Sequence, residues 1–190
     1  MKWEAIIIIL LAFSSLSNED RISWSERRYL SWSDFKGSPE QDGNRAALTA
    51  SGISYRFIAM QRRHHVEMGH YEISAYFYPK DSWYKKELAS EDLLSHEQLH
   101  FDITELHARK FRKLIRERKE VFTEEIKEEI KVIYNAVLNE LNIIQEAYDR
   151  DILKEQNKYK IAFNSHKPPE KQQEWEEFIE QELIKLNAYQ

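Results

Sequence analysis

The strongest constraint on the fold is a change in the spacing of apolar residues near residue 88. Before this point, apolar and polar side chains alternate in segments such as 53–57 and 71–77, which is the two-residue period of a half-buried strand. After it, apolar residues recur every three or four positions, as in an amphipathic helix. The chain therefore predicts an α+β fold, with a small antiparallel sheet over residues 22–80 packed on a helical part over residues 88–187.

The helical part predicts three helices. The first begins after Ser90, which we expect to cap it, and runs to about residue 119. The second begins at Thr123, and the third follows Pro168 and Pro169. The apolar stripe expected for the first helix consists of Leu93, Leu94, Leu99, Ile103, Leu106, Phe111 and Leu114. We expect the charged residues between such stripes to be solvated.

Composition excludes several classes of protein and of site. The chain has 190 residues, which is typical of one domain, and its 42% of hydrophobic residues are enough for a packed core. The 28 basic and 33 acidic residues nearly cancel, so electrostatics give no case for binding nucleic acid. Cysteine is absent, which excludes disulfides, thiolate ligands and cysteine nucleophiles. Any metal must be held by histidine and carboxylate side chains.

The amino-terminal stretch is typical of a secretory signal. An unbroken apolar run covers residues 5–13 and is followed by mostly small residues to position 17. The run is shorter than the roughly 20 residues that a membrane-spanning helix needs. We therefore expect a signal peptide at residues 1–17 and an exported, periplasmic or secreted, single domain at 18–190 without a stable membrane span. The alternative is a buried strand over residues 6–9.

The segment HEQLH at residues 96–100 matches the pattern H-E-x-x-H. Two histidines four positions apart lie on one helix face, so His96 and His100 could converge on one tetrahedral Zn²⁺. Glu97 could then reach a metal-bound water and act as its general base. The alternative is a pair of surface histidines on an amphipathic helix.

A catalytic zinc site needs a third protein ligand and one open position. The extended pattern H-E-x-x-H-x-x-G-x-x-H is absent, because Ile103 and Leu106 stand where glycine and histidine belong. His107 lies on the face of His96 but about 16 Å along the helix, too far to share one metal.

The second predicted helix offers nearer candidates. If the first two helices form an antiparallel hairpin, residues 142–149 return to the level of the HEQLH segment. This places Glu146, Tyr148 and Asp149 beside the predicted metal.

Several short motifs spread over most of the mature chain occur in the order found in one known family. They are LSWSDFKG at 30–37, the segment 47–55, Ser82-Trp83, HEQLHFDI at 96–103 with Glu105 and Ala108-Arg109, Tyr148-Asp149, and QQEW at 172–175. Together they resemble the family of exported bacterial Zn-dependent proteases catalogued as domain of unknown function 922. The resemblance implies a zincin-like fold, Zn²⁺ as cofactor and a peptide or protein as substrate.

The same resemblance bears on the third ligand. In the family, a histidine in a Thr-x-His motif shortly after Tyr-Asp looks like this ligand, but here Ile152 and Lys154 occupy those positions. An insertion would bring His166 to the family's spacing, which implies His166 as the third metal ligand. Asp149 or Glu146 is the alternative, and an incomplete, inactive site is the third possibility.

We therefore expect an exported zinc-dependent metallohydrolase, and specifically a peptidase. Glu97 would take a proton from the zinc-bound water and later protonate the leaving amine. The alternative is a non-catalytic cell-envelope binding or structural protein with a degenerate or structural metal site.

Four further expectations concern residues around this centre. Trp32, Trp83 and Trp175 should be packing residues. Arg109 should brace the metal-bearing helix by pairing with Asp102 or Glu105. Tyr148 should pack or cap, with hydrogen bonding to an oxyanion as the alternative. The strand edge near residues 71–78 could receive an extended peptide.

Overall fold

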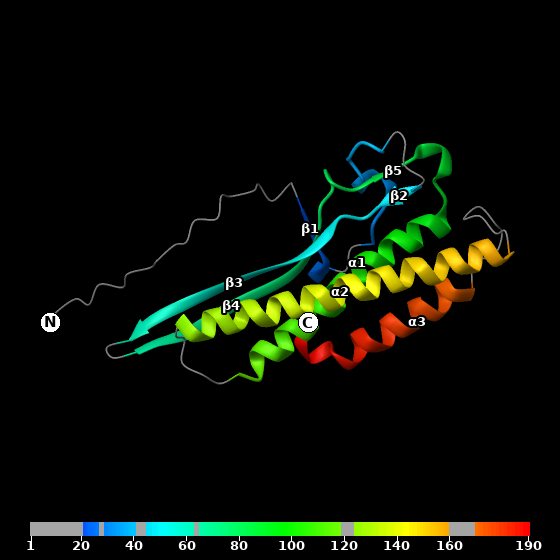
Figure 1. Ribbon diagram of the computed structural model, residues 1–190. Coiled ribbons are helices and arrows are strands. Elements are labelled where there is room, and N and C mark those ends of the chain that lie inside the picture. The colour runs from blue at the N-terminus through cyan, green and yellow to red at the C-terminus, as the bar shows by residue number, and fades with distance from the viewer. Residues whose placement is uncertain (1–20, 27–28, 41–44, 63–64, 119–123, 160–169) are drawn as a thin grey trace.

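The computed structural model of the chain describes residues 21–26, 29–40, 45–62, 65–118, 124–159 and 170–190. The predicted signal peptide and His166 lie outside these residues. The described part is an α+β fold of two small antiparallel sheets and three α-helices, as the sequence predicted (Figure 1).

The first sheet has the strand order β1-β4-β3, and the second pairs β2 with β5. The strands are β1 (Ile22–Ser23), β2 (Ala47–Leu48), β3 (Ser51–Arg62), β4 (His65–Phe77) and β5 (Trp83–Tyr84). The helices are α1 (Glu91–Arg116), α2 (Glu124–Tyr159) and α3 (Glu170–Lys185), with short 3-10 turns η1 (Trp24–Glu26), η2 (Trp32–Asp34), η3 (Lys86–Leu88) and η4 (Asn187–Tyr189). None of the described helices is both long and apolar enough to cross a membrane.

The hairpin of β3 and β4 forms one wall of the core. It pairs from Ser51 opposite Phe77 to Arg62 opposite His65, with an irregularity after Ile58. Alternate residues such as Ile73 and Phe77 are buried, because the two-residue period places them on one face. This ribbon lies along α1, which packs against both of its strands (Figure 1).

The edge of β4 is already occupied where we expected an extended peptide. β4 is the central strand of its sheet, and on the side away from β3 its residues Tyr76 and Phe77 pair with β1. The Ile73 carbonyl accepts a hydrogen bond of 2.8 Å from Arg112 Nε. The expectation that an extended peptide adds to this edge is therefore wrong at Ile73, Tyr76 and Phe77.

α1 is the central element of the fold, because β3, β4, α2 and α3 all pack on it. This central position explains why the apolar stripe predicted for the first helix differs from the residues that α1 buries. Leu114 is 40% exposed, whereas Glu105 and Arg109 are 1% and 3% exposed. A helix covered by several neighbours buries residues around most of its circumference, so the expectation of solvated charges is wrong for these two residues.

The helix boundaries agree closely with the sequence analysis. Ser90 caps α1 as predicted, since its Oγ accepts a hydrogen bond of 3.1 Å from the Leu93 amide. α1 ends at Arg116, slightly before the predicted end, and α2 is described from Glu124. The start of α3 is held by Glu155 of α2, whose carboxylate accepts hydrogen bonds of 3.0 and 2.9 Å from its first two amides.

The three tryptophans interpreted as packing residues do pack. Trp83 is 5% exposed and belongs to the core. Trp32 stacks on Tyr84 with ring centroids 4.4 Å apart, and Trp175 contacts Tyr148 edge-on at 5.7 Å. These contacts link the second sheet and α3 to the core.

Candidate metal centre

Three potential ligand atoms converge between α1 and α2. His96 and His100 lie one turn apart on α1, and their Nε2 atoms are 3.2 Å from each other. Asp149 on α2 places its Oδ1 atom 3.2 Å from His96 Nε2 and 3.0 Å from His100 Nε2. The two helices lie side by side, which is the hairpin arrangement that brought residues 142–149 into consideration (Figure 1).

The spacing of these atoms fits a tetrahedral cation. Ligand atoms about 2.0–2.1 Å from a tetrahedral Zn²⁺ are about 3.3 Å from one another, close to the three separations of this triangle. His96, His100 and Asp149 thus form a group that could hold a metal ion. The histidines are each 8% exposed, whereas the Asp149 side chain is 55% exposed. The site is therefore buried on the α1 side and open to solvent at Asp149.

The electrostatics of the group favour positive charge. Burial lowers the pKa of His100, but the hydrogen bond to Asp149 and the negative charges of Glu97 and Asp149 outweigh it, so this pKa is raised. Burial also raises the pKa of Asp149, but hydrogen bonds and charge from His100 and His96 hold it well below its usual range. Asp149 is therefore a carboxylate at neutral pH, as a metal ligand must be.

Glu97 combines a fixed backbone with an unsatisfied side chain. Its carbonyl accepts a hydrogen bond of 3.1 Å from Thr49 Oγ1, which ties this turn of α1 to the segment between β2 and β3. The side chain is 4% exposed, and its Oε2 atom has no hydrogen-bond partner within the described residues. A buried carboxylate oxygen left without a partner is costly and calls for a functional explanation.

Tyr148 forms the wall behind the two histidines. It is fully buried, stacks on the His96 ring at a centroid distance of 4.6 Å and meets the His100 ring edge-on at 5.2 Å. Its hydroxyl donates a hydrogen bond to Gln172 Oε1 on α3, and burial raises its pKa well above the usual value near 10. These contacts match the packing role expected for Tyr148.

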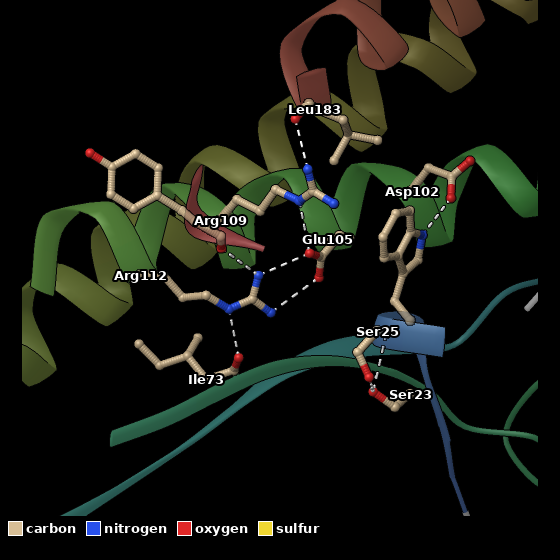
Figure 2. Close-up of polar contacts among 10 residues, drawn as sticks. Ser23, Ser25, Ile73, Asp102, Glu105, Arg109, Arg112 and Leu183 are labelled. Carbon is tan, nitrogen blue, oxygen red and sulfur yellow. Dashed lines mark hydrogen bonds and ion pairs between the residues drawn. The ribbon is translucent and has the colours of Figure 1, made fainter. Parts of the chain in front are cut away.

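A buried charge network braces α1 beyond the metal centre (Figure 2). Arg109 Nε donates a hydrogen bond of 3.0 Å to Glu105, which is one of the two partners expected for it. Asp102 is engaged elsewhere, because it accepts a hydrogen bond of 2.6 Å from Trp24 Nε1. Arg112, which the sequence analysis missed, also binds Glu105 at 2.9 Å.

The described residues bring together most of the predicted site. His96 and His100 are buried and meet Asp149, the alternative third ligand, and Glu97 is buried on the same turn of α1. Glu146, the other alternative, is exposed and is not part of the group.

Gln145 was missed. Its Oε1 atom lies 3.1 Å from His100 Nδ1, and its position four residues before Asp149 on one helix face is a signal that could have found it.

Fold and site together define an α+β protein with a potential His/Asp metal-binding centre. Residues 78–157 match the family described as "Bacterial protein of unknown function (DUF922)". The matched segment includes β5, all of α1 and nearly all of α2, and thus His96, Glu97, His100 and Asp149. No curated protein and no solved structure matches the chain.

Proposed function

We propose that the chain is an exported zinc-dependent hydrolase that cleaves peptide bonds. The observation that carries this proposal is the triangle formed by His96 Nε2, His100 Nε2 and Asp149 Oδ1, whose sides measure 3.0–3.2 Å. Electron-pair donors held this close repel one another unless a proton or a cation lies between them. Two imidazoles and a carboxylate are a usual ligand set for catalytic zinc.

Glu97 is the residue that makes catalysis the preferred function of this centre. When bound, a divalent cation supplies Lewis acidity, which polarises a carbonyl group and lowers the pKa of water. The Glu97 carboxylate accepts a proton from the water as the water oxygen bonds to the carbonyl carbon. It then donates that proton to the amine nitrogen as the carbon–nitrogen bond breaks. Tyr148 keeps bulk water away from the buried side of the two histidines.

Two parts of the proposal rest on the sequence. The peptide substrate follows from the H-E-x-x-H segment on a helix after a sheet, together with the resemblance to Zn-dependent proteases. Export follows from the apolar run within residues 1–17. His166 is proposed as an additional or competing ligand by the same resemblance.

Metal analysis of the purified chain tests the centre. We expect about one zinc per chain in the wild type and marked loss in His96→Ala and Asp149→Ala, because each removes one of three protein ligands. Asp151→Ala, two positions along α2, is the matched control and should keep its zinc. His166→Ala tests the other candidate for the third ligand. Zinc retained in this variant would leave Asp149 as the third ligand, and zinc lost would add His166 to the ligands. A wild type without zinc would contradict the proposal.

Hydrolysis of a peptide library tests the chemistry. Glu97→Gln should keep its zinc but lose at least about a hundredfold in rate, the usual minimum for removing a general base. The exposed Glu180 on α3 supplies the control Glu180→Gln, which should cleave like the wild type. Zinc binding without any activity that depends on Glu97 would instead favour a non-catalytic binding or structural protein.

A further inference from the structure

We propose that Gln145 is a positioning residue that fixes the tautomer and the orientation of His100. The inference rests on the proposed metal centre and concerns how the chain prepares one of its ligands. Gln145 lies on α2, half-buried, four residues before Asp149. Its Oε1 atom is 3.1 Å from His100 Nδ1, the ring nitrogen that faces away from the ligand triangle.

The first step of the argument is the orientation of the Gln145 amide. Its Nε2 atom lies 3.3 Å from Thr104 Oγ1 and 3.5 Å from the His100 carbonyl oxygen. A carbonyl oxygen can only accept, so the side of the amide facing it must carry the hydrogens. Oε1 is therefore the atom turned toward the imidazole.

The second step is that Thr104 is an acceptor for this amide. The Thr104 hydroxyl donates its hydrogen to the His100 carbonyl at 3.1 Å, so its oxygen is left to accept. Ser51 Oγ lies 2.7 Å from Thr104 Oγ1 and must then be the donor of that pair. Thr104 is fully buried, so its hydroxyl has no water with which to exchange these partners.

The consequence is a defined tautomer for His100. Gln145 Oε1 and Asp149 Oδ1 can both only accept, so a His100 ring that gives its Nε2 lone pair to a cation must carry its hydrogen on Nδ1, where Gln145 accepts it. The lone pair is then on Nε2, which points at His96 Nε2 and Asp149 Oδ1. Hydrogen bonds of this kind to the second ring nitrogen orient metal-binding histidines and raise their basicity.

The same hydrogen bonds tie three elements to one ligand. Ser51 begins β3, Thr104 is on α1 and Gln145 is on α2. The His100 ring is thus oriented by the sheet and by both helices, and does not depend on its own rotamer preference alone. Gln145 is the member that touches the ring.

Zinc affinity, measured by competition with a chelator, tests the role of Gln145. Gln145→Leu removes the acceptor at similar volume and should weaken binding about 10- to 100-fold, the usual effect of losing such a partner. Gln145→Glu keeps an acceptor oxygen and should bind within a few-fold of the wild type. The exposed Gln181 on α3 gives the control Gln181→Leu, which should bind unchanged. Equal affinity in Gln145→Leu and the wild type would overturn the proposal.

A second readout does not depend on activity. Long-range ¹H–¹⁵N spectra of the zinc-loaded wild type should show His100 with hydrogen on Nδ1 and none on Nε2. Hydrogen on Nε2 of His100 in the zinc-loaded wild type would overturn the proposal. So would a Gln145→Leu protein that is less stable but binds zinc with unchanged affinity. A wild type that binds no zinc would refute the metal centre itself, whereas zinc binding that does not depend on Gln145 would refute this inference alone.

Discussion

His107 is a fully buried histidine whose environment disfavours protonation. Its Nδ1 donates a hydrogen bond of 2.8 Å to the Ile103 carbonyl, and its Nε2 has no hydrogen-bond partner within the described residues. Burial lowers its pKa, the hydrogen bond to Ile103 and the charge of Glu140 on α2 oppose this, and Lys110 adds to the lowering. Glu140 Oε1 lies 3.8 Å from Nε2, beyond hydrogen-bonding distance. The net result is a neutral imidazole in the core.

This lowered pKa predicts a pH-dependent stability. Below about pH 6.5 the unfolded chain binds a proton that the folded His107 resists, so the free energy of unfolding falls with pH until the folded pKa is reached. The contribution is at most about 1.4 kcal/mol per pH unit. Urea unfolding between about pH 7 and pH 5 should therefore show a steeper loss in the wild type than in His107→Leu.

The comparison must be made on metal-free protein, because metal binding is itself pH-dependent and would add its own contribution to stability. Parallel pH dependences for the wild type and His107→Leu would show that His107 does not resist protonation in the folded chain.

At the scale of the helices, three arginines of α1 bind backbone carbonyls near the carboxyl-terminal end of the chain. Arg109 donates to the Leu183 carbonyl at 2.7 Å, Arg112 to Tyr189 at 3.0 Å and Arg116 to Ala188 at 3.0 Å. Leu183 lies in the last turn of α3, where the helix dipole is negative and favours cations, and Ala188 and Tyr189 lie in η4 just after it. The arginines therefore hold α3 and η4 against α1, and Figure 2 shows Arg109 and Arg112 of this row.

Substitution of Arg112 should destabilise this contact strongly. Arg112→Met leaves the buried Glu105 with one arginine instead of two and frees the Ile73 and Tyr189 carbonyls, at a cost of about 3 kcal/mol or more. The exposed Arg150 on α2 gives the control Arg150→Met, which should lie within about 0.5 kcal/mol of the wild type. Chemical denaturation measures both values, and equal stability of the two variants would argue against the clamp.

At this scale the sequence was informative about helices and much less so about what covers them. The apolar periodicity and Ser90 identified α1 to within a few residues, because caps and stripes are local properties. The burial of Glu105 and the exposure of Leu114 depend on where α3 and the hairpin pack, which no local pattern contains. The same reason explains how much of the site could be predicted. The H-E-x-x-H pattern is local and was found directly, whereas Asp149 could be proposed only from the expected helical hairpin. Gln145 was recognised only from its contact with His100.

Taken as a whole molecule, the fold places the candidate metal centre where α1 and α2 meet. His96 and His100 come from one helix and Asp149 from the other, so a bound cation would link two elements that the unfolded chain leaves apart. Binding to the folded state alone must then stabilise the protein. The proposed centre is in this respect also a structural link.

Zinc should therefore raise the stability of the wild type. At a free zinc concentration about 100 times the Kd, the gain is about 2.7 kcal/mol, visible as a rise in Tm of several degrees. Asp149→Asn, which keeps the shape but weakens the ligand, should show much less of this rise at the same zinc concentration. A rise in Tm as large in Asp149→Asn as in the wild type would place the stabilising zinc elsewhere.

The amino-terminal end of the described chain has partners that are synthesised much later. Ile22 pairs with Phe77, and Trp24 bonds to Asp102, which is 78 positions further along the chain. While the polypeptide is being made, neither contact can form until the distant partner has emerged, and closing such long loops is slow. β1 can therefore join its sheet only after Phe77 has been synthesised, and the bond that ties Trp24 to α1 can form only after Asp102 has followed.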